Sequence, residues 1–111
     1  MITVRVKKEY QDILAPDENL QETVDALLRE QAIERANRRI VELRQKMQGW
    51  EEKYGCSYDL FVYRTATDEE YVAQLNASTD TAQWEADLLT WEFYAQELRE
   101  WYQRLQNALT A

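Results

Sequence analysis

Histidine is absent from this chain, and glycine, proline and cysteine are rare. Without histidine, the chain lacks the commonest general base of enzymes and a frequent ligand of zinc and di-iron sites. Only two glycines and one proline interrupt the sequence, which favours long helices over a strand-rich sandwich. No glycine-rich phosphate loop is present. We therefore predict a non-enzymatic protein that uses no cofactor and no metal.

The single cysteine, Cys56, excludes a disulfide within one chain and any paired-cysteine metal site. A lone thiol is typical of a reducing compartment, so we expect a cytoplasmic protein. The N-terminal segment lacks the apolar stretch of a signal peptide. No apolar run approaches the ~20 residues that a membrane-spanning helix requires, so we expect no membrane association.

The charge of the chain is acidic and unevenly distributed over a length of 111 residues, about one domain. Residues 1–55 contain ten Lys or Arg and eleven Asp or Glu, whereas residues 56–111 contain three and ten, which together give the net charge of −8. Solubility alone accounts for many acidic compositions. The asymmetry nevertheless indicates that a cationic partner would bind the second half. We treat residues 1–111 as a single helical domain.

Hydrophobic periodicity predicts a mainly α fold with two long helices, at about 20–54 and 80–109. Asn19 and Glu22 have the spacing of a capping box, and Gly55 is a candidate left-handed C-cap. A helix of about 30 residues would be roughly 45 Å long, so it needs a companion along its length, from this chain or from a second copy. The connector of about 25 residues permits an antiparallel hairpin or bundle with coiled-coil-like packing.

Short helices are expected between the two long ones. Ser57 can cap the first of them, and Thr67 with Glu70 forms a second capping box. Asp80 with Gln83 has the same spacing and is expected to cap the final helix.

Alternating β-branched and polar residues predict one short strand over residues 2–7, with the segment 1–16 used in dimerisation. An exposed edge strand protected by charge is one interpretation. The alternative is a ribbon, as in ribbon-helix-helix proteins, whose outward residues Thr3, Arg5 and Lys7 would bind DNA.

Segment 80–109 carries the most distinctive pattern of the chain. Apolar residues recur at spacings of three and four: Trp84, Leu88, Trp91, Ala95, Leu98, Tyr102, Leu105 and Leu109. Tryptophans at this spacing are usually core residues, but the two long helices expose more apolar circumference than one contact covers. Acidic residues between the rings would repel nucleic acid and attract a basic protein. The predicted partner-binding residues are Trp84, Glu85, Asp87, Trp91, Glu92, Tyr94, Glu97 and Trp101.

Two other interpretations remain. The chain is a purely structural homo-oligomeric helical bundle, or it is a magnesium-dependent hydrolase of the all-α nucleotide pyrophosphohydrolase type. The hydrolase would use the carboxylate pairs Glu22 and Asp25, Glu51 and Glu52, and Glu97 and Glu100. These charges fall mainly opposite the apolar stripes, where solvated faces are expected.

Residues 40–105 also resemble a known group of proteins. A long helix ends in Glu-Lys-Tyr-Gly at residues 52–55, a short serine-led helix reaches Phe61, and a final helix carries Trp84, Glu85, Asp87, Trp91, Glu92 and Phe93. This arrangement resembles small acidic antitoxins of cyanobacterial and archaeal type II toxin–antitoxin modules. The resemblance implies a protein that binds and neutralises a cognate toxin, often a basic ribonuclease.

Overall fold

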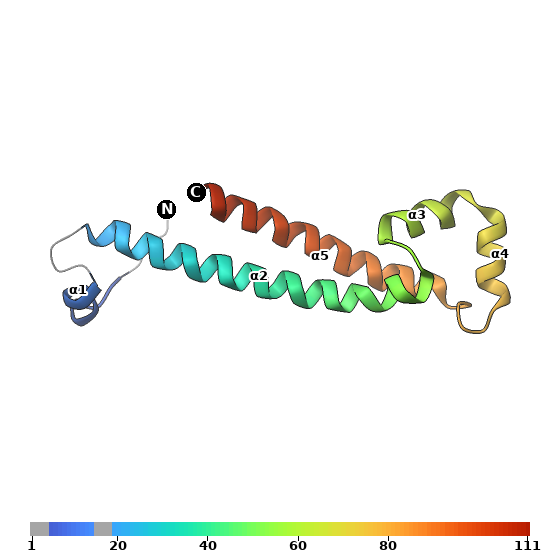
Figure 1. The fold of residues 1–111 in the computed structure, drawn as a ribbon, viewed down its shortest axis with the longest axis horizontal. Coiled ribbons are helices and arrows are strands. Elements are labelled where there is room, and N and C mark those ends of the chain that lie inside the picture. The colour runs from blue at the N-terminus through green and yellow to red at the C-terminus, as the bar shows by residue number, and fades with distance from the viewer. Residues whose placement is uncertain (1–4, 15–18) are drawn as a thin grey trace.

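The computed structural model describes residues 5–14 and 19–111, and these residues form an elongated helical structure (Figure 1). The prediction of a mainly helical chain is confirmed. The helices, in chain order, are α1 (Lys8–Leu14), α2 (Leu20–Tyr54), α3 (Tyr58–Thr67), α4 (Glu69–Ala77) and α5 (Trp84–Thr110).

The predicted strand over residues 2–7 is not found. Residues 2–4 lie outside the described residues, and residues 5–7 are irregular. The carbonyl of Lys7 instead accepts hydrogen bonds from the amides of Tyr10 and Gln11, which begin α1. A strand needs a neighbour to satisfy its backbone groups, and the described part of the chain offers no second strand. The alternation of apolar and polar residues was therefore not sufficient to predict a strand.

Helix α2 has the bounds that the sequence predicts, because both of its caps are formed. The side chain of Asn19 accepts a hydrogen bond from the amide of Gln21 at 2.9 Å, which satisfies one of the free donors of the first turn. At the other end, Gly55 has φ 68° and donates its amide to the carbonyl of Glu51 at 2.8 Å. Gly49 does not interrupt the helix.

The two glycines provide a matched pair of substitutions. Neither a Cβ at Gly49 nor one at Gly55 would meet any atom within 4 Å, so only the backbone conformation differs. We expect Gly55→Ala to lower the free energy of unfolding by about 1–2 kcal/mol, because its φ is left-handed. Gly49→Ala should raise it by about 1 kcal/mol, since glycine is unfavourable within a helix. Urea unfolding of both variants tests this, and a stabilising Gly55→Ala would contradict it.

The short helices follow the predicted order, but one of their caps differs. Ser57 caps α3 by accepting a hydrogen bond from the amide of Leu60 at 3.3 Å, as predicted. Asp68, not Thr67, caps α4 through the amide of Tyr71 at 3.0 Å. The Thr67 hydroxyl donates instead to the carbonyl of Tyr63 at 2.7 Å, so Thr67 ends α3.

Helix α5 begins at Trp84 and not at about Asp80. The residues before Trp84 form turns, in which the hydroxyl of Thr81 donates to the carbonyl of Leu75 at 2.7 Å. Gln83 occupies the N-cap position, and no hydrogen bond from its side chain caps the helix within the described part of the chain. The Asp80–Gln83 capping box is therefore wrong. The bond from Thr81 holds this turn against α4, so the helix starts only after it.

Helices α2 and α5 lie side by side and run antiparallel (Figure 1). Their register is visible in two contacts: Arg29 donates to the carbonyl of Leu109 near one end, and Lys53 forms an ion pair with Asp87 near the other. The structure measures 70 × 21 × 20 Å. Its radius of gyration is 21.9 Å, against about 13 Å for a compact domain of this length. The molecule is therefore a rod.

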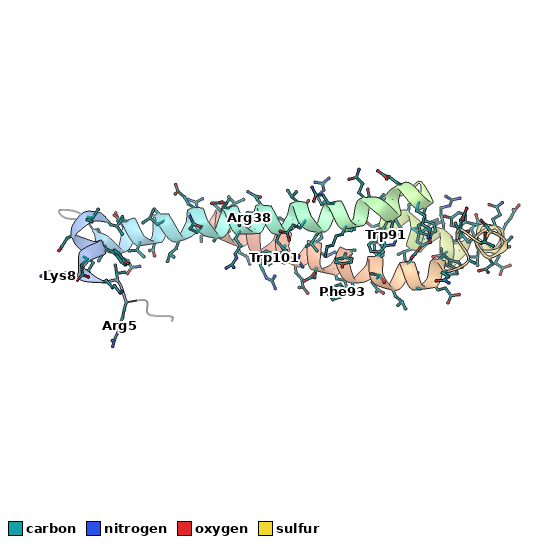
Figure 2. All side chains as sticks on the ribbon, turned by 90° about the horizontal axis from the view of Figure 1, so that it is seen from below. Arg5, Lys8, Arg38, Trp91, Phe93 and Trp101 are labelled. Atoms are coloured by element: carbon teal, nitrogen blue, oxygen red, sulfur yellow. The ribbon has the colours of Figure 1, made fainter. Side chains whose placement is uncertain are left out.

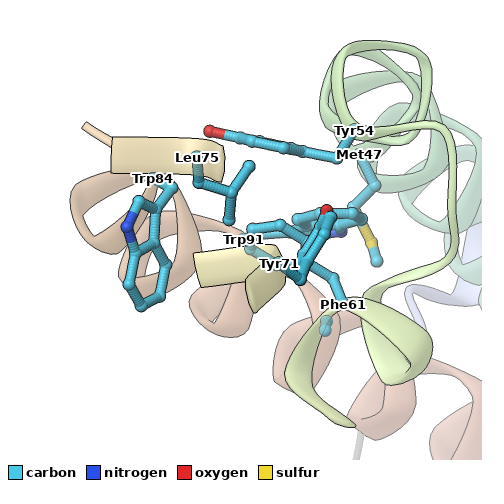
Figure 3. Close-up of a cluster of buried hydrophobic side chains, with 8 residues drawn as sticks. Met47, Tyr54, Phe61, Tyr71, Leu75, Trp84 and Trp91 are labelled. Carbon is cyan, nitrogen blue, oxygen red and sulfur yellow. The ribbon is translucent and has the colours of Figure 1, made fainter. Parts of the chain in front are cut away.

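The core lies at one end of this rod, where α3 and α4 fold against the hairpin (Figure 3). Buried side chains from all four elements meet there: Met47, Tyr54, Phe61, Tyr71, Leu75, Trp84, Trp91 and Ala95. Between Leu20 and Arg35, all of which the structure describes, no side chain is buried. None of the helices in the described ranges is both long and apolar enough to cross a membrane.

Candidate partner-binding surface

Trp91 is the centre of the aromatic core. Its side chain is 0% exposed, and its ring lies 5.4 Å from that of Phe61 and 6.2 Å from that of Tyr54, centroid to centroid. Trp50 stacks at 6.1 Å and Tyr58 approaches edge-on at 5.7 Å. Such offset and edge-on pairs stabilise beyond their buried area. The apolar stripe of α5 therefore packs, at Trp91, against other residues of the same chain.

Trp84 is also part of this core. It is 9% exposed, its indole N–H donates to the side chain of Asn76 at 2.9 Å, and its ring meets Phe61 edge-on. Trp84 and Trp91 were both predicted to contact a partner. The structure buries them against α2, α3 and α4, so they support the surface of α5 and do not form it.

Asp87, another predicted contact, is engaged within the chain. Its carboxylate accepts hydrogen bonds from the Lys53 ammonium at 2.8 Å and from the Tyr54 hydroxyl at 2.5 Å. Burial raises the pKa of Asp87, but the hydrogen bonds from Lys53 and Tyr54 outweigh this, and the pKa lies below its ordinary value. Burial, and then the hydrogen bond to Asp87, raise the pKa of the Tyr54 hydroxyl. This network joins the end of α2 to the start of α5.

Glu97 and Tyr94 face α2 as well. Glu97 forms an ion pair with Arg39 at 3.0 Å, and its side chain is 29% exposed. The half-buried ring of Tyr94 lies 5.7 Å from that of Trp50, and the Lys46 ammonium lies 5.0 Å from its centroid. Like Asp87, both residues contact cationic side chains of α2.

The three remaining predicted contacts retain accessible surface: Trp101 and Glu92 are half-buried, and Glu85 is exposed. The guanidinium of Arg104 covers the ring of Trp101 at 4.7 Å, a cation–π contact within α5. The pKa of Tyr58 is raised, first by the burial of its hydroxyl and then by the negative charge of Glu92. Neither Glu92 nor Glu85 forms an ion pair within the described ranges, and Glu85 is exposed.

The exposed side of α5 carries an apolar pair that is not among the predicted partner-binding residues. Leu89 is 69% exposed and Phe93 is 59% exposed, and the two lie four residues apart on the helix. Figure 2 labels Phe93 on α5. At 100° per residue, Leu89 and Phe93 share an arc of about 100° with three acidic residues. We call this surface the outer strip: Glu85, Leu89, Glu92, Phe93 and Glu100.

The outer strip lies on the side of α5 away from the buried stripe. Within the described ranges, no residue of α2 forms an ion pair with its carboxylates. Phe93 touches only the edge of the core, with its ring 5.5 Å from that of Tyr94. Glu100 approaches Arg104 at 3.8 Å, and both side chains are well exposed. The spacing of Leu89 and Phe93, four residues apart and outside the main stripe, was the signal in the sequence that could have identified them.

The residues predicted for DNA binding lie far from this strip. Arg5 and Lys7 are exposed and directly precede α1. Figure 2 shows Arg5 far along the rod from Trp91, and Thr3 lies outside the described residues. The predicted ribbon is not formed by residues 5–7.

The carboxylate pairs do not assemble into a metal site in the described part of the chain, where no group of three or more His, Cys, Asp or Glu is placed to hold an ion. Asp25 accepts a hydrogen bond from the side chain of Gln21 at 2.9 Å, as an ordinary helix-surface residue does. Burial raises the pKa of the half-buried Cys56 thiol, while the charge of Arg64 opposes this.

No known protein family, curated protein or solved structure matches this chain. The fold and the surface together define an elongated helical hairpin with an acidic, apolar strip on α5.

Proposed function

We propose that this protein is a non-enzymatic, protein-binding antitoxin whose α5 outer strip contacts a basic partner. The observation that carries the proposal is the exposure of Leu89 and Phe93, at 69% and 59%, beside the carboxylates Glu85 and Glu92. Isolated surface apolar residues need no explanation, but a leucine and a phenylalanine one turn apart form a contiguous anchor.

The rigid core below the outer strip favours such a contact. Tyr94 supports the ring of Phe93, and α5 is held to α2 by Trp91 and by the Asp87 network. A preformed surface loses little conformational entropy on binding. The unpaired carboxylates of Glu85 and Glu92 then favour a cationic partner and increase the rate of encounter.

A basic ribonuclease is the partner that the resemblance to antitoxins implies. An enzyme that binds the RNA backbone carries cationic groups near its substrate, and the carboxylates of the outer strip would pair with them. The lone Cys56 supports a reducing cytoplasm as the compartment. Self-association of the rod belongs to the same proposal, since its far half buries few side chains.

A purely structural homo-oligomer is the second candidate. The 70 Å length and the exposed Leu27 and Leu28 on α2 favour it, because additional helices would cover these side chains. The two candidates differ in whether the outer strip has a foreign partner.

Co-expression with the protein encoded by the adjacent open reading frame tests the proposal. We expect the wild-type chain to relieve the growth arrest caused by that protein, and Leu89→Asp and Phe93→Asp each to abolish the relief. Loss of a buried interface anchor costs about 2 kcal/mol or more, roughly 30-fold in affinity. Deleting α5 would be uninformative, because the core would lose Trp84 and Trp91.

Tyr63→Asp is the matched control, since Tyr63 is an aromatic residue on α3 that is 66% exposed and lies outside the outer strip. This variant should protect the cells as well as the wild type. Full protection by Leu89→Asp and Phe93→Asp would contradict the outer strip as the contact. A neighbouring protein that causes no growth arrest would contradict the antitoxin.

A further inference from the structure

The two flanks of the α2–α5 hairpin differ in whether their charged side chains form ion pairs within the described part of the chain. On one flank, Arg39 pairs with Glu97 at 3.0 Å and Lys53 pairs with Asp87 at 2.8 Å. These contacts join the two helices within one chain. The charges of this flank are therefore satisfied internally, and a second molecule would gain little from them.

The other flank contains a hollow of about 620 Å³ between the same two helices. Val41, 53% exposed, and Tyr102, 43% exposed, contribute apolar surface to it, above the half-buried Leu98. An adjoining hollow of about 280 Å³ shares Leu98 and Tyr102 and continues to Tyr58. Together they form a continuous groove, which we call the open flank.

The open flank also carries charges that the chain leaves unpaired. Arg44 and Glu51 both line the larger hollow, and Arg99 and Asp59 line the smaller one. None of these four side chains forms an ion pair with any residue in the ranges 5–14 and 19–111. Arg44 has only a long contact of 3.5 Å with the hydroxyl of Tyr102. Two positive and two negative groups thus surround exposed apolar surface.

The positions of these charges match a second copy of the same groove. Arg44 and Glu51 lie seven residues apart on one face of α2, about 10 Å at 1.5 Å per residue, so they are too far apart to pair with each other. A two-fold axis near Gln48, midway between them, would place each Arg44 against Glu51 of the second copy. In such an isologous contact one ion pair necessarily occurs twice. A foreign partner would need no such internal symmetry.

We infer that the open flank binds a second copy of this chain, antiparallel and about a two-fold axis near Gln48. The dimensions of the rod agree with this. A standard stable interface buries about 800 Å² per protomer, and the rod, at 70 × 21 × 20 Å, offers a flank long enough for a contact of that size. The arrangement leaves Leu89 and Phe93 of the outer strip accessible, because neither residue lines the groove. The inference identifies the surface for the self-association within the proposed function, and it rests on that part of it.

Sedimentation of the full chain with charge-reversed variants tests the interface. We expect the wild type to be a dimer, and Arg44→Glu and Glu51→Arg each to weaken association about 100-fold, because each places two pairs of like charges together. The double variant R44E/E51R restores opposite charges across the axis and should recover the dimer to within about tenfold of the wild type.

Arg38→Glu is the matched control. Arg38 is an exposed arginine of the same helix that pairs with Glu34 at 2.8 Å and does not line the groove. This variant makes the same change in net charge as Arg44→Glu but lies off the groove, so it should leave the dimer unchanged. Circular dichroism should show native helicity in every variant, since the substituted side chains are exposed.

The outcomes separate the inference from the proposal on which it rests. A wild type that is monomeric at 100 μM overturns both the self-association and its interface. If Arg44→Glu and Glu51→Arg leave the dimer intact, or if the double variant fails to restore it, the open flank is not the interface. The self-association itself would then still stand. Loss of partner neutralisation in Phe93→Asp with an intact dimer would leave the interface supported.

Discussion

Replacing Trp91 with alanine is expected to lower the free energy of unfolding by about 4 kcal/mol. The side chain is 0% exposed and contacts four other aromatic rings, including those of Tyr54 and Phe61. Removing the indole would leave a large cavity where α2, α3 and α5 meet. Natural domains are stable by only about 5–15 kcal/mol, so this single change removes much of the stability of the chain.

Urea unfolding of Trp91→Ala beside two control variants makes this prediction specific. Trp91→Phe keeps an aromatic ring and removes an indole N–H that finds no hydrogen-bond partner among residues 5–14 and 19–111, so it should destabilise by much less. Trp101→Ala removes a half-buried indole of the same helix and should cost about 1 kcal/mol. Equal losses in Trp91→Ala and Trp101→Ala would contradict a core centred on Trp91.

Replacing Asp87 with alanine should lower the free energy of unfolding by about 2–3 kcal/mol at neutral pH. The change removes the ion pair with Lys53 and leaves the buried Tyr54 hydroxyl without its acceptor. Asp87→Asn keeps an acceptor for Tyr54 but loses the charge, so its effect should be about 1 kcal/mol. Thermal or urea unfolding measures both, and an unchanged Asp87→Ala protein would show that the network contributes nothing.

The pH dependence of this contribution has a definite sign. The pKa of Asp87 is lowered in the folded chain, so the unfolded chain binds the proton more readily, and protonation favours unfolding. The stabilisation is complete above the unfolded value of about 3.9 and is lost as the pH falls through the folded pKa. The stability difference between wild type and Asp87→Asn should therefore shrink in acid. A difference that grows there would contradict the assigned shift.

Much of the fold follows from local signals in the sequence. The bounds of α2 were predictable because Asn19 and Gly55 act through their own turns, and Ser57 caps α3 for the same reason. The start of α5 was not predictable from local signals. It depends on the hydrogen bond from the Thr81 hydroxyl to the carbonyl of Leu75 in α4, which fixes the turn before the helix. Residues 5–7 do not form the predicted strand, because a strand depends on a neighbour that local alternation cannot supply.

The candidate surface was less predictable, for a related reason. Periodicity placed Trp84 and Trp91 on one face of a helix but could not determine whether this chain or a partner covers that face. The structure shows α2, α3 and α4 covering both indoles. The ion pairs of Asp87 and Glu97 could not be predicted without the register of the hairpin. That register places Lys53 opposite Asp87 and Arg39 opposite Glu97. Leu89 and Phe93 remained exposed because they lie outside the stripe that α2 covers.

We propose that α5 has two faces: a buried face that stabilises the rod, and the outer strip, which binds a basic partner. Hydroxyl-radical footprinting, with the adjacent gene's product as partner, measures both faces at once. We expect partner binding to protect Phe93 and Leu89 from oxidation, whereas Trp91 stays unmodified in the free and bound states. Unchanged oxidation of Phe93 and Leu89 in the complex would contradict it.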